Sequence, residues 1–190
     1  MPVVPAHPKV ASDTPVAVRS SATPPVTGLY TPEERRRRDA TRWTLVQGIL
    51  APLQFLVMAV SVALVIRYLR TGDGLVAAHV SVIAKTITLY TIMITGAIWE
   101  KVVFGQYLFA RPFFWEDVVS MGVIALHTAY LVGLAQSWSP RTLMLLALVA
   151  YGTYAINAVQ FIFKLRAARL QEARSAKHAA QKSAVTEQAA

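Results

Sequence analysis

VAAHVSVIAKTITLYTIMITGAIW, residues 76–99, is an apolar run that contains a single charged side chain, Lys85. An α-helix rises about 1.5 Å per residue, so about 20 residues cross the hydrocarbon core of a bilayer. The run has that length, and the charged residues Glu100 and Lys101 follow it directly. This stretch therefore predicts a transmembrane helix.

Three further apolar segments lie on either side of this run. Residues 43–69 precede it, with the turn residues 71–74 between, and residues 114–136 and 141–165 follow it. Each segment is long enough to cross a membrane, and a fold that left one out would place its apolar side chains in water. We therefore expect an all-α, polytopic membrane protein, a bundle of four transmembrane helices.

The residues before the first apolar segment divide into two parts. Residues 1–28 are rich in proline, alanine, serine and threonine and have no continuous apolar core, so we expect a disordered extension and no signal peptide. Thr31, Pro32 and Glu34 then form the pattern of a helix start with a capping box. The arginines at 35–38 make this helix too basic to enter the bilayer. We expect it to lie at the cytoplasmic headgroups, with a solvated charge run as the alternative.

The composition favours a membrane protein and excludes several other classes. Hydrophobic residues make up 55% of the chain and charged residues 15%, whereas a soluble domain has about 25% charged residues. The net charge of +9 lies at the chain ends and between the apolar runs, so we expect no nucleic-acid binding. The absence of cysteine excludes disulfides and thiolate metal sites.

The distribution of lysine and arginine predicts the orientation of the four helices. Most of them lie before the first segment, between the second and third, and after the fourth, whereas the other side has only Arg67, Arg70 and Arg141 near helix ends. The positive-inside rule therefore places both termini in the cytoplasm. We expect residues 29–166 to form the transmembrane domain and residues 167–190 a basic tail that continues the last helix and then frays.

Polar side chains within the apolar segments are the first candidates for function, because their exposure to lipid is costly. Lys85 and His127 lie about 21 Å and 18 Å from the predicted cytoplasmic edge, so the two can meet inside the bundle. Alternatively, Lys85 extends to the interface or pairs with a tyrosine or a backbone carbonyl. Tyr130 and Asn157 add further polar groups. Haem binding between His79 and His127 is disfavoured, because their depths differ by about 9 Å.

Three carboxylates form a second group at the predicted cytoplasmic edge. Glu100 follows the second segment, Glu116 and Asp117 begin the third, and the loop between is rich in aromatic residues. Glu116 and His127 lie within about 40° of one another around the third helix, on a polar stripe that leads into the bundle. An acid and a base can thus face each other across one aromatic mouth. The alternative is that these carboxylates are ordinary interfacial charges and helix caps, with Trp115 as a membrane-interface anchor.

Long strings of this sequence resemble one family closely: LYTPEERRRRDATRWTLVQGILAPLQFL (29–56), KTITLYTIMITGAIWEKVVFGQYLFARPFFWEDVVSM (85–121) and ALHTAYL (125–131). The family is that of the 3-vinyl bacteriochlorophyllide hydratases of phototrophic bacteria. The resemblance covers residues 29–136 closely and the fourth segment loosely. It implies a hydro-lyase that adds water to the C3 vinyl group of a chlorophyllide-type macrocycle, which gives the 3-(1-hydroxyethyl) product in bacteriochlorophyll biosynthesis. It also implies a place in the bacterial inner membrane, cytoplasmic or intracytoplasmic and photosynthetic.

The implied partners are the tetrapyrrole substrate, water and the lipid membrane, together with other enzymes of the pigment pathway or a second copy of this chain. We expect no cofactor and no protein-bound metal, since the substrate carries its own magnesium. A non-enzymatic membrane protein that binds pigment or assists assembly is the main alternative, and a pigment that gains the mass of water distinguishes the hydratase from it. A transporter or channel is disfavoured because the chain shows no inverted repeat.

The resemblance assigns no catalytic residue, so the candidates come from the polar groups above. One of Glu100, Glu116 and Asp117 is expected to donate a proton to the vinyl group while a carboxylate orients water. Glu116 is favoured because it shares a helix face with His127, which is alternatively a ligand of the substrate magnesium. Glu116 and His127 lie about 16 Å apart along the helix, so at most one of these two assignments holds. The predicted substrate-binding residues are His127, Lys85, Tyr130, Trp115, and Lys101 or Arg111 opposite the substrate carboxylate.

Overall fold

Five α-helices make up the computed structural model, which describes residues 29–188 without the side chains of 172, 179, 180 and 182–188. No strand occurs in that range, so the all-α prediction is confirmed there. The predicted disordered extension, residues 1–28, lies outside the described residues. The helices are α1 (Pro32–Ala40), α2 (Arg42–Thr71), α3 (Leu75–Phe104), α4 (Phe114–Ala135) and α5 (Pro140–Gln188).

Helix α1 begins at its capping residues. Thr31 Oγ1 accepts a hydrogen bond from the backbone N–H of Glu34, and the Glu34 carboxylate accepts one from the N–H of Thr31, which completes a capping box. Arg37 reaches from α1 to the end of α3, where it donates to the carbonyl oxygen of Val103 at 3.4 Å. Helix α1 therefore lies beside the end of α3, and its position at membrane headgroups remains a prediction.

Four helices in the described part of the chain are long and apolar enough to cross a membrane, namely α2, α3, α4 and the portion Pro140–His178 of α5. Their outward faces carry exposed apolar side chains such as Leu56, Ile87 and Ile162. Such side chains are stable on a surface that faces lipid, because the acyl chains are as apolar as they are. Four apolar helices of membrane-spanning length were predicted, and the described residues contain them.

Helix α3 is longer than the sequence pattern predicts, and α5 continues through the residues expected to form a basic tail. Helix α3 continues to Phe104, so Glu100 and Lys101 lie within its last turns instead of following it. Helix α5 continues to Gln188, because no proline follows Pro140 and the stretch is rich in alanine and long polar side chains, which favour helix. The residues predicted as a basic tail thus continue the helix of the fourth span as far as Gln188.

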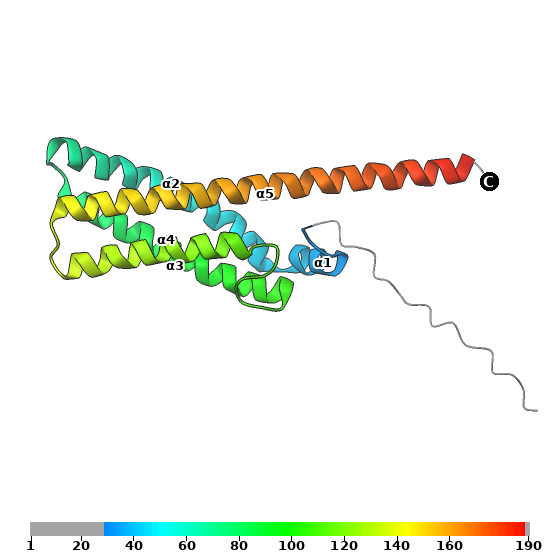
Figure 1. The fold of residues 1–190 in the computed structure, drawn as a ribbon, viewed down its shortest axis with the longest axis horizontal. Coiled ribbons are helices and arrows are strands. Elements are labelled where there is room, and N and C mark those ends of the chain that lie inside the picture. Colours follow the sequence, from blue (N-terminus) through cyan, green and yellow to red (C-terminus); the bar gives the residue numbers. More distant parts are fainter. Residues whose placement is uncertain (1–28, 189–190) are drawn as a thin grey trace, which may run out of the picture.

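The helices form two antiparallel hairpins, α2–α3 and α4–α5 (Figure 1). Gly72 and Gly74 connect α2 to α3 with φ angles of 80° and 84°, which residues with a Cβ rarely adopt. In the turn between α4 and α5, Trp138 folds back onto Gly133, where a Cβ would lie 2.7 Å from the Trp138 ring. Each hairpin therefore closes through a short turn that depends on glycine.

The two hairpins join mainly through α2 and α5, whereas α3 and α4 approach each other less closely. The apolar core near the two turns includes Val65, Val82, Met144 and Ala147. At the opposite end of the bundle lie α1, the α3–α4 loop (residues 105–113) and the point where α5 extends beyond the other helices (Figure 1). We call this end the mouth.

Candidate functional site

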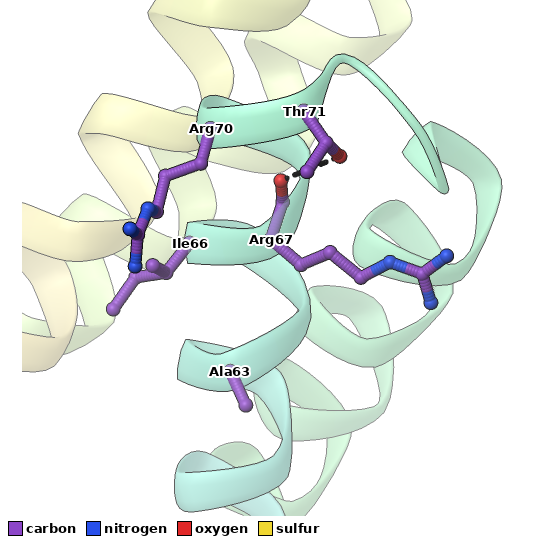
Figure 2. Close-up of a pocket in the computed structure, with 5 residues that line it drawn as sticks. All are labelled: Ala63, Ile66, Arg67, Arg70 and Thr71. Carbon is purple, nitrogen blue, oxygen red and sulfur yellow. Dashed lines mark hydrogen bonds between the residues drawn. The ribbon is translucent and has the colours of Figure 1, made fainter.

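A shallow, open hollow near the turn between α2 and α3 is lined by Ala63, Ile66, Arg67, Arg70 and Thr71 (Figure 2). Its two arginine side chains extend in different directions. Thr71 Oγ1 donates to the Arg67 carbonyl oxygen at 2.9 Å, which satisfies the hydroxyl within the helix. No carboxylate, imidazole or predicted site residue lines the hollow. The buried polar residues lie elsewhere, at the mouth and in the bundle interior.

Glu100 and Asp117 form a buried carboxyl pair at the mouth. They are 5% and 7% exposed, and their carboxyl groups lie close enough to interact with each other. Glu100 lies near the end of α3 and Asp117 on the first turn of α4, so the short α3–α4 loop brings them together. Two buried carboxyl groups in contact repel each other when both are ionised, which favours a proton on one of them. The pair therefore combines a proton donor with a carboxylate.

The α3–α4 loop is anchored to the same two carboxyl groups. Glu100 Oε2 accepts a hydrogen bond from the N–H of Ala110 at 3.2 Å, and Asp117 Oδ2 accepts one from the N–H of Phe109 at 2.7 Å. Phe109 has a φ of 59°, in the left-handed region that bulky residues rarely adopt. Such strain persists only where surrounding contacts hold it. Glu100 and Asp117 thus hold the strained α3–α4 loop in place through these two hydrogen bonds.

Glu116 has a different partner. Its Oε2 lies 2.6 Å from Lys164 Nζ of α5, and the two side chains are 9% and 27% exposed. The Lys164 ammonium also lies 5.2 Å from the centroid of the Phe113 ring. Of the three predicted carboxylates, the structure pairs two with each other and the third with a lysine. Sequence reasoning gave Lys164 no role at the site, because its partner Glu116 lies 48 residues away in the chain.

Aromatic side chains pack around these groups at the mouth. Phe113, which is 1% exposed, stacks on Phe161 of α5 with ring centroids 5.2 Å apart and meets Trp99 edge-on at 5.7 Å. The predicted residue Trp115 is not part of this cluster; it is 71% exposed, and Tyr107 is also exposed. The aromatic residues of the mouth are therefore divided between a buried cluster and an outward apolar face. The buried cluster consists of Tyr30, Trp99, Phe104, Phe113 and Phe161.

A row of polar contacts runs from the mouth into the bundle between α4 and α5. Beyond the ion pair of Glu116, Asn157 Nδ2 donates to Ser120 Oγ at 2.7 Å. Deeper still, the ring of His127 lies 5.8 Å from the ring of Tyr151. The polar stripe on α4 therefore lies against α5.

His127 is 1% exposed, and its Nε2 has no hydrogen-bond partner among the described residues. Its Nδ1 lies 2.9 Å from the carbonyl oxygen of Val123. A carbonyl oxygen only accepts, so Nδ1 carries the hydrogen, and in the neutral ring Nε2 carries a lone pair. This nitrogen can bind a metal ion that a ligand brings into the bundle. Within residues 29–188, apart from the side chains left undescribed, no group of three or more His, Asp or Glu side chains could hold a metal ion.

Lys85 is completely buried between the hairpins. Its ammonium donates to Gln54 Oε1 and lies 3.7 Å from the centroid of the Tyr154 ring. Gln54 Nε2 in turn donates to the carbonyl oxygen of Thr88 at 3.3 Å. Lys85 also lies within electrostatic range of His127. The structure therefore places Lys85 against the ring of Tyr154, which is the alternative in which this lysine pairs with a tyrosine.

The remaining predicted binding residues lie apart from the carboxyl pair. Tyr130 OH is hydrogen-bonded to His79 Nδ1 at 2.6 Å, in the half of the bundle near the turns. Lys101 Nζ donates to the carbonyl oxygen of Gly105 at 2.7 Å, and Arg111 is exposed on the α3–α4 loop. Two cations therefore lie beside the loop at the mouth, while Tyr130 lies deep in the bundle.

The sequence matches the family model described as 2-vinyl bacteriochlorophyllide hydratase over residues 30–167. A relative of that name from Rhodobacter capsulatus is 67% identical over 145 residues, which cover 76% of this chain and 85% of the relative. A relative of the same name from Cereibacter sphaeroides is 68% identical over 142 residues, which cover 75% of this chain and 89% of the relative. No solved structure matches the chain. The predicted resemblance is confirmed, and the chain belongs to the 2-vinyl bacteriochlorophyllide hydratase family.

Proposed function

We propose that this chain hydrates the vinyl group of a bacteriochlorophyllide, the reaction that the name of its relatives describes. The locants 2 and 3 come from two numbering schemes for the tetrapyrrole ring and denote the same vinyl group. The product is then the 1-hydroxyethyl pigment, and the activity is that of a hydro-lyase in bacteriochlorophyll biosynthesis. The observation that carries the proposed site is the buried Glu100–Asp117 pair, because two adjacent buried carboxyl groups favour one protonated acid beside one carboxylate.

Hydration of a vinyl group on a conjugated ring takes place in two steps. A carboxyl group transfers its proton to the terminal vinyl carbon, so that an O–H bond breaks, a C–H bond forms and positive charge spreads over the macrocycle. A water oxygen then bonds to the inner carbon, and its surplus proton passes to the carboxylate of the pair. The pair returns to its starting state, and the pigment has gained one water.

The three carboxylates have different roles in this scheme. Glu100 and Asp117 donate and recover the proton. Glu116, ion-paired with Lys164, keeps a negative charge near the developing cation. Its contact with a lysine favours the other two carboxyl groups as the acid, although the sequence pattern favoured Glu116.

The macrocycle is proposed to lie against the outward apolar face of the mouth. Tyr107, Phe114 and Trp115 expose their rings there, and a flat conjugated ring can stack on them. Lys101 and Arg111 lie on the same part of the chain and suit the substrate carboxylate. The carboxyl pair lies beneath the α3–α4 loop. The vinyl group therefore reaches the pair when the loop shifts and the hydrogen bonds from the N–H groups of Phe109 and Ala110 to the two carboxyl groups break.

A deeper pose, with the substrate magnesium bound at His127 Nε2, is the alternative. His127 lies about 16 Å beyond Glu116 along α4. This distance exceeds the separation of the central magnesium from the vinyl group. One bound macrocycle therefore cannot place its magnesium at His127 and its vinyl group beside Glu116 at the same time. The predictions that His127, Lys85 and Tyr130 contact the substrate belong to the deeper pose. The mouth pose is preferred because the carboxyl pair lies there.

We further propose that the chain crosses the bacterial inner membrane, cytoplasmic or intracytoplasmic, with both termini in the cytoplasm. Helix α1 and the extended end of α5 lie at the same end of the bundle, which supports this orientation (Figure 1). The arginines of α1 and the basic residues at the end of α5 suit the cytoplasmic side and its anionic lipids. Association with other enzymes of the pigment pathway or with a second copy remains a prediction.

The experiment measures the mass of the pigment after incubation of vinyl chlorophyllide with membranes that contain the full chain. A hydratase adds the mass of one water, whereas a pigment-binding or assembly protein adds none. Glu100→Gln and Asp117→Asn are each expected to lower turnover by about 10²- to 10⁴-fold, since each removes one member of the pair. The exposed residues Glu33 and Asp73 provide matched controls, Glu33→Gln and Asp73→Asn, which should retain turnover. Full turnover in both pair variants would exclude the pair as the acid.

A further inference from the structure

Asn157 of α5 has an amide oxygen that is shielded from solvent and has no hydrogen-bond partner among the described residues. The other end of the amide donates to Ser120 Oγ at 2.7 Å. Turning the amide over only exchanges the two ends, because the serine hydroxyl can accept or donate. Buried polar atoms almost always find a partner in the protein or in bound water. One end of the Asn157 amide therefore requires a small hydrogen-bonding ligand.

This unsatisfied amide lies one helical turn deeper than the carboxyl groups of the mouth. Its partner Ser120 follows Asp117 by three residues and Glu116 by four on α4. Residues with these spacings lie on one face of a helix, about 4.5–6 Å apart along its axis. The Asn157 amide is thus the next polar contact inward from the site of proton transfer.

The reaction needs two oxygen atoms at about this separation. The acid oxygen must approach the terminal vinyl carbon, and the water oxygen must approach the inner carbon. Each approach is about 3 Å, so together with the carbon–carbon bond the two oxygens lie roughly 6–7 Å apart or less. A water that donates a hydrogen bond to the amide oxygen keeps a lone pair free for attack. The offset between Asn157 and the carboxyl groups therefore matches the dimensions of the reacting group.

We propose that the Asn157 amide, held by Ser120, binds the water that attacks the vinyl cation and afterwards accepts a hydrogen bond from the new hydroxyl group of the product. This inference rests on the proposed hydration and adds a binding site for its second reactant. The water oxygen forms its bond to the inner carbon as the cation accepts the lone pair. The surplus proton goes to the carboxylate of the Glu100–Asp117 pair, because an amide does not take it up.

The test separates proton transfer from water attack with deuterium. In D₂O the carboxyl pair delivers a deuteron to the terminal vinyl carbon, and loss of a proton from the cation returns a vinyl group that carries deuterium. Asn157→Leu removes the water site and leaves the pair intact. Hydration should fall on the order of 10²-fold, while deuterium continues to enter the recovered vinyl pigment. Gln160→Leu, an exposed position one turn further along α5, is the matched control and should change neither quantity.

Ser120→Ala provides a second variant, since it frees the amide without removing it. Ser120→Ala should lower the ratio of hydration to deuterium entry, as Asn157→Leu does, but by a smaller factor. Equal losses of hydration and deuterium entry in Asn157→Leu would show a merely structural role and overturn the inference, as would unchanged hydration. Failure of the proposed function has a different signature: the unmodified chain would neither hydrate the pigment nor introduce deuterium.

Discussion

Removal of the Glu116–Lys164 ion pair is expected to destabilise the contact between α4 and α5. The Glu116 carboxylate and the Lys164 ammonium lie 2.6 Å apart, with side chains that are 9% and 27% exposed. A hydrogen bond to a charged group contributes about 1.5–3 kcal/mol to stability. Because more than a quarter of the Lys164 side chain is in contact with solvent, we expect a coupling energy at or just below the lower end of that range, about 1–2 kcal/mol.

The perturbation is a double-mutant cycle of Glu116→Gln and Lys164→Met. Lys164→Met should be the more harmful single change, because it leaves the buried carboxylate without its cation and also removes the cation from the Phe113 ring. We expect it to lower the free energy of unfolding by about 2 kcal/mol. The double variant has neutral groups of similar length at both positions and should be more stable than the sum of the single changes predicts.

The assay is unfolding of the detergent-solubilised full chain, followed by the loss of helical circular dichroism, with turnover measured on the same samples. The exposed pair of Glu33 and Arg37 on α1, 2.8 Å apart, is the matched control and should show little coupling. Glu116→Gln should retain more turnover than Glu100→Gln. Single-variant effects that add within about 0.3–0.5 kcal/mol would refute the reasoning from this ion pair.

Three further changes test other parts of the structure. Gly133→Ala should lower the free energy of unfolding by about 1–3 kcal/mol, because the new Cβ would lie 2.7 Å from the Trp138 ring. Gly152→Ala is the control and should not lower it, because its Cβ meets open space. Equal melting temperatures of the two variants would contradict the predicted clash at Gly133. Phe109→Gly should be more stable than Phe109→Ala by roughly 1 kcal/mol, because glycine adopts the left-handed φ without strain; chemical denaturation compares the two, and a more stable alanine variant would argue against a strained loop. His127→Ala should retain turnover if the pigment binds at the mouth; loss of turnover together with loss of an axial-ligand signature in the spectrum of the bound pigment would instead support the deeper pose.

The boundaries of the helices could be predicted where a strong local signal exists. Thr31 with Glu34 marks the start of α1, and the glycines at 72 and 74 mark the turn between α2 and α3. The prediction was least accurate where a helix leaves the expected membrane region. There charged residues such as Glu100 look like a helix end, yet helix α3 continues to Phe104 because lysine, glutamate and valine are all compatible with helix.

The residues of the candidate site could also be predicted in part. Glu100, Glu116 and Asp117 were recognisable because carboxylates next to apolar spans are costly unless they have partners. Which carboxylate pairs with which partner was not recognisable. Glu116 binds a lysine 48 residues away, and the Glu100–Asp117 contact depends on how the α3–α4 loop folds.

Hydropathy and charge along the chain were sufficient to predict a membrane-type helical bundle, because transfer of apolar side chains from water depends on local composition and needs no knowledge of neighbours. The family was indicated separately, by the resemblance of the long strings at 29–56, 85–121 and 125–131. The rotation of each helix about its axis and its contacts with the others are collective properties of the packed bundle. Those properties brought the Glu100 and Asp117 carboxyl groups together, turned Glu116 towards Lys164, and left the amide oxygen of Asn157 without a partner among the described residues. Because hydrogen bonds form only within about 3 Å, a small rotation of one helix would have chosen other partners from the same residues.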